Sequence, residues 1–513
     1  MLKRLIYASL AAASLISPAL ATEAPIRISL NSDIRSTHPS TNRDFNTDTV
    51  LLHIVEGLVA FNEKTLPVPM LAEKIDVSAD GKLYTFKLRS GVTFHNGAPL
   101  TAGDVVWSLK HYLDPATQWY CRAEMTGRIA NIIDVKAIDA STVAVSLEKA
   151  APLFLVTLAR PDCGETAILH PSSVDANGAW VRPVGTGPYK LGEWRQGQYI
   201  DLVPFANYAS LPGEPDGFVG GKKALAPLRF MIVPDTSAAK TALLAGGIDV
   251  VTDVPSSELL SLRDDRSVRI VSAPTMGITC IVFNTRAPFL KDARIRRAIE
   301  LSIDVPEIVD GLVGTDAPPN SSLIPSSSSY HDIVQSAVPQ RDLPAARKLL
   351  AEAGYKGQPI KMMTNRRYAD LYDASVAVQG MAAEAGINIQ LEVLDWPSQL
   401  DSYNRGLYQS MAMIFSGRFD PSLTYDAYTG SRDVNPNRIW EDPDALKLVK
   451  QTMETSDRAA RQSDFDKLYA MFIDQVPIVV LYNQPSYTIV RPNVTGLKAW
   501  ASGYPRLWNV SKN

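Results

Sequence analysis

The sequence predicts a mixed α/β protein with about three domains. Segments with the 3.6-residue hydrophobic period of helices alternate along the chain with segments that have the two-residue period of strands. The chain has 513 residues, and a domain usually takes roughly 100–200 of them. Hydrophobic residues make up 46% and charged residues 20%, which is ordinary for a folded soluble protein and excludes a disordered chain.

The first third of the chain carries two helix patterns. In residues 47–58, the apolar side chains recur at the spacing of one helical face. In residues 101–113, Thr101 is suited to cap the N-terminus, and Asp104 follows it three residues later. Alternating apolar and polar residues predict strands around these helices, at residues 26–30, at 83–88, and as a pair within 135–147.

The rest of the chain predicts further strands and helices, with two crossings between domains. Residues 178–192 are rich in Gly and Pro, and residues 271–280 precede a new run of helices, so we expect the chain to cross at both places. The predicted strands are 200–205, 228–233, 279–283, 360–364, 387–394, 411–415, 477–482 and 487–490. The predicted helices are 237–245, 293–303, 306–312, 343–353 and 371–385.

Residues 1–21 have the composition of a secretory signal peptide. Two basic residues precede an apolar run from residue 5 to residue 16, and Ala19 and Ala21 form an A-x-A cleavage site. This run is shorter than the roughly 20 residues that span a bilayer, although a retained anchor is the alternative interpretation. The cleavage point has no cysteine that would carry a lipid. We therefore expect a mature protein that is free in the periplasm.

The sequence gives little support for nucleic-acid binding or for catalysis. A net charge of −3 does not build the positive field that nucleic acid requires. The chain has no G-x-S-x-G motif, and its histidines show no H-E-x-x-H spacing. Ser237 and Lys240 match S-x-x-K, but no K-T-G follows, and Ser237 is also suited to cap a helix. We predict a protein that is not an enzyme and binds no cofactor or metal, with an exported hydrolase as the alternative.

Three cysteines are too few to hold a chain of this size together, so a hydrophobic core must do so. In an oxidising compartment two of the three can pair. Cys121 and Cys163 fall in what we expect to be one domain, so we favour that bridge over one to Cys280. The alternative interpretation is three buried thiols.

One long segment resembles a known protein family. It runs from Leu88 to Leu109 and reads LRSGVTFHNGAPLTAGDVVWSL. Further motifs follow in the family's order, including GTGPY at 185–189, LAGGID at 244–249 and AARKLLAEAGY at 345–355. Together they resemble the family 5 solute-binding proteins, the large extracytoplasmic receptors of ABC importers for peptides, nickel chelates, opines and some sugars. The resemblance extends from about residue 26 to the end of the chain.

The resemblance implies a type II periplasmic binding protein with two lobes and an extra domain inserted in lobe one. A small-molecule ligand would bind between the lobes, which close on it like a hinged clamp. The implied partners are the transmembrane subunits of an ABC permease, and the receptor itself is expected to be a monomer. The implied division is a signal peptide at 1–21, lobe one at 22–45, 182–270 and 480–513, an inserted domain at 46–181, and lobe two at 271–479.

The ligand class is inferred from a turn that departs from the peptide-binding pattern of this family. In peptide-binding members, an Asp just before a Gly-Asp-Pro turn holds the ligand's ammonium, and an Arg in a strand-to-helix loop holds its carboxylate. Here the turn reads SGRFDP at 416–421, so Arg418 would repel a cationic group. Arg366 and Arg367 lie in the other loop, and the three guanidinium groups favour an anionic solute, such as an opine or a sugar-phosphate conjugate. The alternatives are a di- or oligopeptide, a nickel chelate, and a simple ion pair between Arg418 and Asp420.

Other side chains near these loops complete the predicted ligand-binding set. Aromatic rings stack on sugars or cover the apolar face of a ligand, although packing in the core is the alternative for each of them. Aromatic residues flank the loops of lobe two, and Trp500, Tyr504 and Trp508 cluster near the C-terminus. Besides the three arginines, the predicted ligand-binding residues are Asp420, Trp396, Tyr425, Tyr428, His38 and Trp508.

Overall fold

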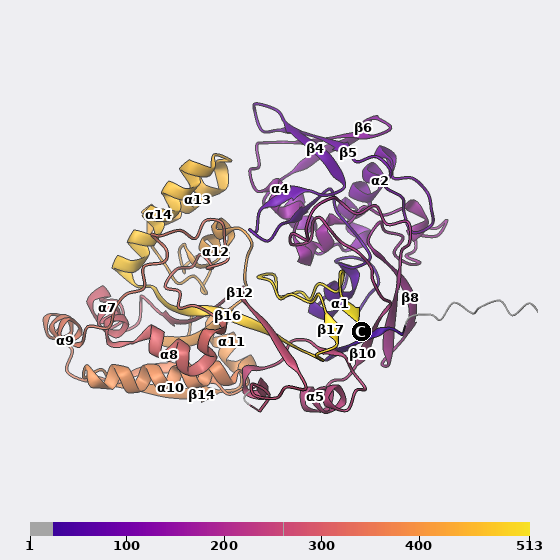
Figure 1. Cartoon of the computed structure of the whole chain (residues 1–513). Coiled ribbons are helices and arrows are strands. Elements are labelled where there is room, and N and C mark those ends of the chain that lie inside the picture. Colours follow the sequence, from indigo (N-terminus) through magenta and orange to yellow (C-terminus); the bar gives the residue numbers. More distant parts are fainter. Residues whose placement is uncertain (1–23, 260) are drawn as a thin grey trace, which may run out of the picture.

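A large mixed sheet runs through the whole molecule in the computed structural model, which describes residues 24–259 and 261–513 (Figure 1). The predicted signal peptide, residues 1–21, lies outside the described residues. The sheet has ten strands in the order β14-β13-β15-β12-β16-β11-β1-β10-β9-β8. Their bounds are β1 Ile26–Leu30, β8 Tyr189–Arg195, β9 Tyr199–Pro204, β10 Leu228–Ile232, β11 Val250–Val251, β12 Arg269–Phe283, β13 Ile360–Asn365, β14 Ile389–Leu394, β15 Ser410–Phe415 and β16 Ile478–Val490.

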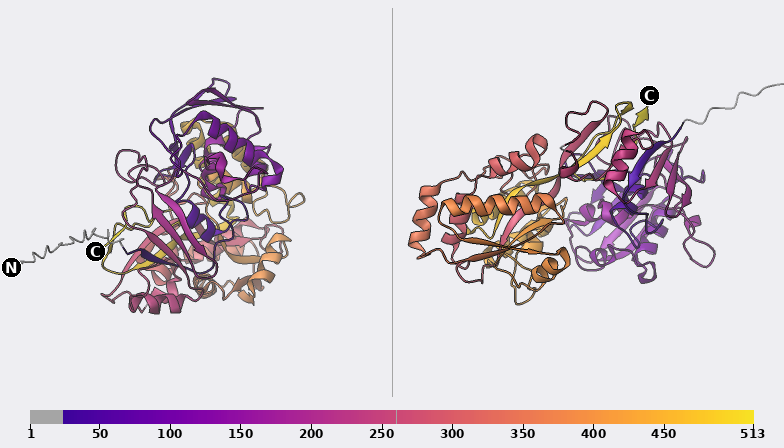
Figure 2. Two further views of the ribbon diagram at one scale, coloured as in Figure 1. Left: turned by 90° about the vertical axis from the view of Figure 1, so that its right-hand side faces the viewer. Right: turned by 90° about the horizontal axis from the view of Figure 1, so that it is seen from below.

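The molecule has two lobes (Figure 2). Each lobe combines strands and helices, which confirms the predicted α/β class. We call the part built on β1 and β8–β11 the first lobe. It includes the sheet β4-β5-β7-β6, the hairpin β2-β3 and the pair β17-β18. Its other elements are α1 Phe45–Leu51, β2 Val59–Phe61, β3 Pro67–Pro69, β4 Ala72–Val77, β5 Leu83–Leu88, α2 Ala102–Leu113, α3 Arg122–Met125, β6 Ile132–Asp139, β7 Thr142–Leu147, α4 Phe154–Leu158, α5 Thr236–Leu244, α6 Ser256–Leu259, β17 Val494–Thr495 and β18 Ser511–Lys512, with 3-10 turns at Pro115–Thr117, Pro161–Thr166 and Pro171–Ser173.

The second lobe is built on β13–β15 and covered by helices (Figures 1 and 2). Its helices are α7 Ala293–Ser302, α8 Val305–Val313, α9 Leu343–Glu352, α10 Ala369–Glu384, α11 Trp396–Asn404, α12 Pro421–Tyr428, α13 Pro443–Glu454 and α14 Arg458–Gln475, with a 3-10 turn at Gly314–Asp316. The residue boundaries of the domains given above stay a prediction. In the part of the chain that the structure describes, no helix has both the length and the apolar character needed to cross a membrane.

Two long antiparallel strands, β12 and β16, belong to both lobes. Their pairing runs from Arg269 opposite Val490 to Val282 opposite Ile478. Pro274 lies opposite Pro485, and the register shifts directly after this pair. The chain therefore passes from one lobe to the other at the predicted 271–280, within the strand β12, and the strands predicted at 477–482 and 487–490 are the single strand β16. Pro274 and Pro485 interrupt the strand pattern of the sequence, so each long strand was predicted only in part. A sheet tolerates proline at a bulge.

The helix predicted at 47–58 ends early because its carbonyl groups bind another segment. α1 stops at Leu51, and the carbonyls of His53 and Ile54 accept hydrogen bonds from the N–H groups of Tyr189 and Gly187, at 3.1 and 3.0 Å. A Cβ atom on Gly187 would lie 2.6 Å from the carbonyl carbon of Ile54, so only glycine permits this approach. Distant parts of the chain thus override the local helical pattern.

The segment that resembles the known family forms a strand, a turn and a capped helix. β5 has the predicted bounds, and α2 begins directly after Thr101. The Asp104 carboxylate accepts hydrogen bonds from the backbone N–H and the hydroxyl of Thr101, at 2.8 and 2.6 Å. The predicted cap is confirmed, and the role of this segment is structural.

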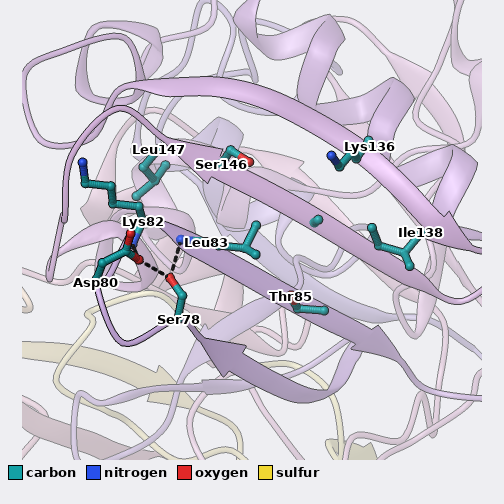
Figure 3. Close-up of a pocket in the computed structure, with 10 residues that line it drawn as sticks. Ser78, Asp80, Lys82, Leu83, Thr85, Lys136, Ile138, Ser146 and Leu147 are labelled. Atoms are coloured by element: carbon teal, nitrogen blue, oxygen red, sulfur yellow. Dashed lines mark hydrogen bonds between the residues drawn. The ribbon is translucent and has the colours of Figure 1, made fainter.

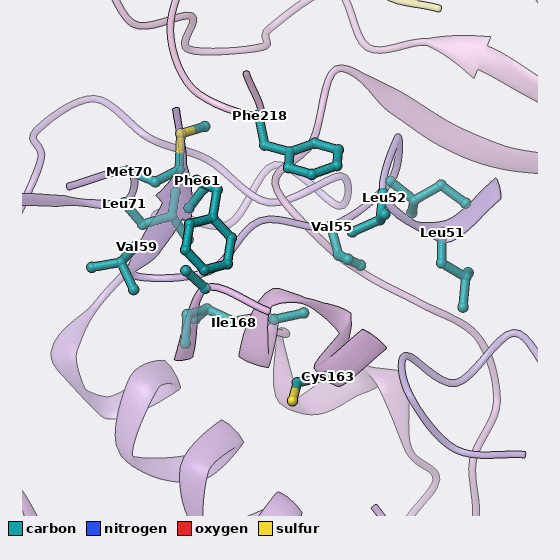
Figure 4. Packing of buried hydrophobic residues seen from close by; sticks show 14 of the residues in the cluster. Leu51, Leu52, Val55, Val59, Phe61, Met70, Leu71, Cys163, Ile168 and Phe218 are labelled. Carbon is teal, nitrogen blue, oxygen red and sulfur yellow. The ribbon is translucent and has the colours of Figure 1, made fainter. Parts of the chain in front are cut away.

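The first lobe has a large hydrophobic core (Figure 4). A disulfide reinforces it. Cys121 and Cys163 form this bridge, with Cα atoms 5.5 Å apart, which confirms the favoured pairing and overturns the interpretation of three thiols. Cys280 is the free cysteine of the described chain and is buried in β12. The bridge ties the loop after α2 to the segment after α4.

A buried carboxylate, Glu165, lies two residues after this disulfide. Its side chain is fully buried, and among the described residues neither carboxylate oxygen has a hydrogen-bond partner. Nearby, the buried Glu56 accepts from Thr186, Tyr208 and Lys222, at 3.0, 2.7 and 3.3 Å. Burial raises the pKa of the Glu165 carboxyl to about 8, and the charge of Lys222 only partly opposes this shift.

This raised pKa predicts that the protein loses stability as the pH rises. In the unfolded chain a Glu carboxyl ionises near pH ~4.3, whereas folded Glu165 keeps its proton up to about pH 8. The folded state therefore binds the extra proton across this window, and stability falls as the pH rises through it. We expect Glu165→Gln to remove about 3 kcal/mol of the loss between pH 6 and pH 9, measured by urea unfolding. The exposed Glu73→Gln serves as control, and equal pH profiles for wild type and Glu165→Gln would contradict the assignment.

Candidate functional site

The candidate site is a cleft of about 1480 Å³ between the two lobes. Its floor is the pair of shared strands, around Thr275–Gly277 and Gln484–Thr488. A second hollow, of about 490 Å³, lies on the small sheet of the first lobe (Figure 3). There the polar groups of the β4–β5 turn already bind each other, since Ser78 donates to Asp80 at 2.6 Å and accepts from the N–H of Leu83 at 2.9 Å. The cleft between the lobes is therefore the candidate site.

The second lobe contributes a wall of arginines to the cleft. β13 and β15 are neighbouring parallel strands, and both end at the cleft. Arg366 and Arg367 follow the end of β13, Arg418 follows the end of β15, and Arg438 lies beyond α12. Because parallel strands place their carboxyl ends at the same sheet edge, side chains from distant sequence positions meet here.

These arginines carry positive charge that the protein does not neutralise with ion pairs. Within the described residues, none of the four guanidinium groups forms an ion pair with a carboxylate. Arg366 lies over the ring of Tyr372 and donates to its hydroxyl at 2.8 Å, and Arg438 donates to the backbone carbonyl of Asp426. Asp370 and Asp426 are the carboxylates of this wall, so four positive charges face two negative ones.

A close backbone contact fixes the turn that carries Arg418. A Cβ atom on Gly417 would lie 2.0 Å from the Cβ of Met276, so glycine is required where this turn crosses the floor of the cleft. On its other side, the ring of Phe419 stacks on Phe61 of the first lobe, with centroids 4.2 Å apart and an interplanar angle of 8°. The turn therefore contacts both the floor and the opposite lobe.

The wall of the first lobe is aromatic and close to neutral. Phe45, Tyr120 and Tyr504 line it together with Arg43. Arg43 is paired with Asp48, which also accepts a hydrogen bond from the Tyr504 hydroxyl at 3.2 Å. Burial raises the pKa of Asp48 to about 6, against the opposing effect of Arg43.

Further arginines on this wall are also paired. Arg160 binds Asp162 through two hydrogen bonds of 2.9 and 2.6 Å, and Arg128 lies 3.4 Å from Glu124. The charges of these pairs are thus matched within the wall. Asp253 is a further carboxylate of the first lobe that lines the cleft, and it forms no ion pair within the described residues. The excess positive charge of the cleft belongs to the second lobe.

The three predicted arginines line the cleft, whereas Asp420 lies outside its lining. Arg366, Arg367 and Arg418 all line the cleft. Asp420 is buried, caps α12 by accepting from the N–H of Ser422, and forms an ion pair with Arg461 at 2.6 Å. Its carboxylate is occupied, so both the predicted ligand contact and the alternative pair with Arg418 are replaced by this structural role.

The predicted aromatic residues and His38 also lie outside the cleft lining. Tyr425 and Tyr428 are buried in the core of the second lobe, and Trp396 packs against Tyr368, which does line the cleft. Trp508 is buried beneath Lys222. His38 is buried, with its Nε2 2.9 Å from Nε2 of His111. Each of these rings packs within the folded protein, and its predicted contact with a ligand stays a prediction.

Sequence analysis missed the aromatic residues that do line the cleft. Phe45 and Tyr120 line the cleft from segments of the first lobe that lie outside the motifs quoted above. Tyr504 was noted only as part of a C-terminal cluster. Large aromatic residues are usually buried, so neither their type nor their spacing separates a core ring from an exposed one. Only the tertiary structure shows which rings face the cleft.

The S-x-x-K match has a structural explanation. Lys240 forms an ion pair with Glu258, and Ser237 donates to the same carboxylate at 3.3 Å. Asp235, rather than Ser237, caps α5. A lysine held by a carboxylate in this way is not available as a base for the serine.

A cleft between two α/β lobes, closed at its back by a pair of shared strands, defines the class of extracytoplasmic solute-binding proteins. The chain belongs to the family described as bacterial extracellular solute-binding proteins, family 5, whose middle region matches residues 67–436. The family resemblance inferred from the motifs is thereby confirmed.

Comparison with individual proteins gives the same class. The chain is 25% identical over 484 residues to the periplasmic murein peptide-binding protein MppA of Escherichia coli strain K12, covering 89% of this chain and 86% of MppA. It is 27% identical over 396 residues to the glutathione-binding protein GsiB of the same strain, covering 76% of this chain and 73% of GsiB. The structure of HbpA2 from Haemophilus parasuis superposes with a TM-score of 0.80 at 22% identity, covering 96% of this chain and 100% of HbpA2. MppA and GsiB are both named as binding proteins, and the likeness to HbpA2 shows the same fold.

Proposed function

We propose that this protein is the periplasmic substrate-binding component of an ABC importer and captures a small anionic solute. The observation that carries the proposal is the arginine wall of the second lobe, where Arg366, Arg367, Arg418 and Arg438 face the cleft without carboxylate partners among the described residues. After export, the receptor would deliver its ligand to the transmembrane permease. Opines and sugar-phosphate conjugates belong to the proposed ligand class.

The physical argument rests on the cost of desolvating charge. When the lobes close, the guanidinium groups lose water, and an unpaired buried charge is costly. A carboxylate or phosphate offsets this free-energy cost because it accepts two parallel hydrogen bonds from a guanidinium group. A ligand with a free ammonium at this wall would instead meet like charge. Ligand binding would therefore favour the closed form only for anionic groups at this position.

Peptides are the second candidate ligand class, and the names of two relatives favour them. MppA is named for murein peptides and GsiB for glutathione. A peptide would fit the cleft if its carboxylate met the arginine wall and its ammonium met the other lobe, where Asp162 and Glu124 lie. Neutral dipeptides and acidic peptides therefore separate the two candidates.

Arg418→Ala is expected to weaken the binding of anionic ligands at least tenfold. Hydrogen bonds to a charged group contribute about 1.5–3 kcal/mol, and about 1.4 kcal/mol corresponds to a tenfold change in affinity. Thermal shift with opines, sugar phosphates, acidic peptides, neutral dipeptides and nickel chelates would find the ligand class, and calorimetry would measure the loss. The exposed Arg405→Ala, away from the cleft, is the matched control. A thermal shift with neutral dipeptides alone would overturn the anionic proposal in favour of an ordinary peptide receptor.

A further inference from the structure

Two aromatic side chains of the first lobe are exposed on the wall opposite the arginines. Phe45 is 39% exposed and Tyr120 is 54% exposed as whole residues, and both line the cleft. Other rings of the first lobe, such as Trp500 and Trp508, are buried in its core. An exposed apolar surface on the wall of a binding cleft usually marks a contact with a ligand.

The environment of these rings holds them in place. Phe45 stacks on Tyr504, with centroids 4.6 Å apart and an interplanar angle of 14°. The Tyr504 hydroxyl is anchored on the buried Asp48, which also pairs with Arg43. The guanidinium carbon of Arg43 in turn lies 5.3 Å from the centroid of the Tyr120 ring.

The position of Tyr120 is fixed by the covalent structure as well. It directly precedes Cys121, whose disulfide to Cys163 ties this segment to the core. Its N–H donates to the carbonyl of Ser40 at 2.9 Å. Both rings are thus presented on a rigid surface, so a ligand that covers them need not first order them.

We propose that the ligand is an anion that carries a ring, with its carboxylate or phosphate on the arginine wall of the second lobe and its ring packed on Phe45 and Tyr120. This inference rests on the proposed function, because it uses the same cleft and the same arginines. It adds that charge alone does not define the ligand. An aromatic ring or the apolar face of a sugar would cover the exposed aromatic surface when the lobes close.

Two matched pairs of probes test the inference and separate the sources of the anionic group. N-acetylphenylalanine and N-acetylalanine are carboxylates without an ammonium that differ in a ring, and glucose 6-phosphate and sorbitol 6-phosphate are six-carbon phosphates of which only the first is cyclic. Calorimetry on the mature protein is expected to show that the ring-bearing member of at least one pair binds about tenfold more tightly than its ringless partner. The pair that shows this preference identifies the anionic group.

The double variant Phe45→Ala, Tyr120→Ala is expected to reduce this preference to less than about twofold while ringless anions still bind. Both side chains are partly exposed, so the melting temperature should stay close to that of the wild type. Tyr199→Ala is the matched control. The ring of Tyr199 also contacts an arginine, since its centroid lies 4.1 Å from the guanidinium carbon of Arg229, but Tyr199 lies outside the cleft.

The outcomes distinguish this inference from the proposed function. Equal affinity within both pairs, or a preference that survives in the double variant, would overturn the ring contact. If ringless anions still bind and Arg418→Ala abolishes that binding, the proposed function stands alone. If none of the four probes binds at millimolar concentration, the ring contact is overturned, and the anionic proposal is decided by the wider panel that includes opines.

Discussion

Asp420→Ala is expected to lower the free energy of unfolding by about 3–5 kcal/mol, because it breaks a buried ion pair. The Asp420 carboxylate lies 2.6 Å from the guanidinium of Arg461, and the two side chains are 4% and 7% exposed. Arg461 would remain buried beside Tyr330 and Ser422, whose hydroxyls would be its remaining side-chain partners in this cluster. The substitution also removes the cap of α12. Urea unfolding monitored by circular dichroism would measure the loss.

The matched control is Asp426→Ala, which removes a half-buried carboxylate from the same helix without breaking an ion pair within the described residues. We expect that variant to stay close to the wild type in stability. If Asp420→Ala weakened ligand binding while leaving stability unchanged, the structural role of Asp420 would be wrong. The original expectation of a ligand contact would then be restored.

Removal of the Cys121–Cys163 disulfide is expected to cost about 4 kcal/mol. The bridge closes a loop with a sequence separation of 42 residues, and the entropy that such a cross-link removes from the unfolded chain corresponds to roughly this value. The double variant Cys121→Ala, Cys163→Ala should therefore unfold at lower urea concentration than the wild type. Wild-type protein treated with dithiothreitol should move in the same direction.

Dithiothreitol should have no further effect on the double variant, which serves as the internal control. Cys280→Ala should respond to the reductant as the wild type does, since Cys280 takes no part in the bridge. Equal stability of oxidised and reduced wild-type protein would contradict the prediction. Such a result would mean that the core of the first lobe holds this loop without the cross-link.

Sequence analysis recovered elements whose causes are local. The bounds of β5 follow from strict alternation, and the start of α2 follows from the hydrogen bonds between Thr101 and Asp104. The helix at 47–58 was overestimated, because its last carbonyl groups bind a segment more than a hundred residues away. Helices α11–α14 were missed although three of them begin with an Asp cap and a Pro in the first turn, a signal that could have been recognised.

The sequence predicts the cleft residues that follow the ends of strands. It does not predict the aromatic residues whose role depends on how far the folded protein exposes them. Arg366, Arg367 and Arg418 follow two strands that were predicted from their pattern, and the family resemblance placed both loops at the ligand. The aromatic wall could not be anticipated, because the sequence does not distinguish a buried ring such as Tyr425 from an exposed ring such as Phe45. Burial is a property of the tertiary structure, and no local pattern encodes it for a single ring.

The proline pair in the shared strands determines how the two lobes are mechanically connected. Neither Pro274 nor Pro485 has an N–H group, so at this point of the ladder neither residue donates a backbone hydrogen bond. The ladder is therefore interrupted at this pair, which lies beside the floor of the cleft. Fewer backbone hydrogen bonds oppose bending here than elsewhere along the two strands. The free energy of ligand binding can then go into affinity instead of being spent on deforming the connection.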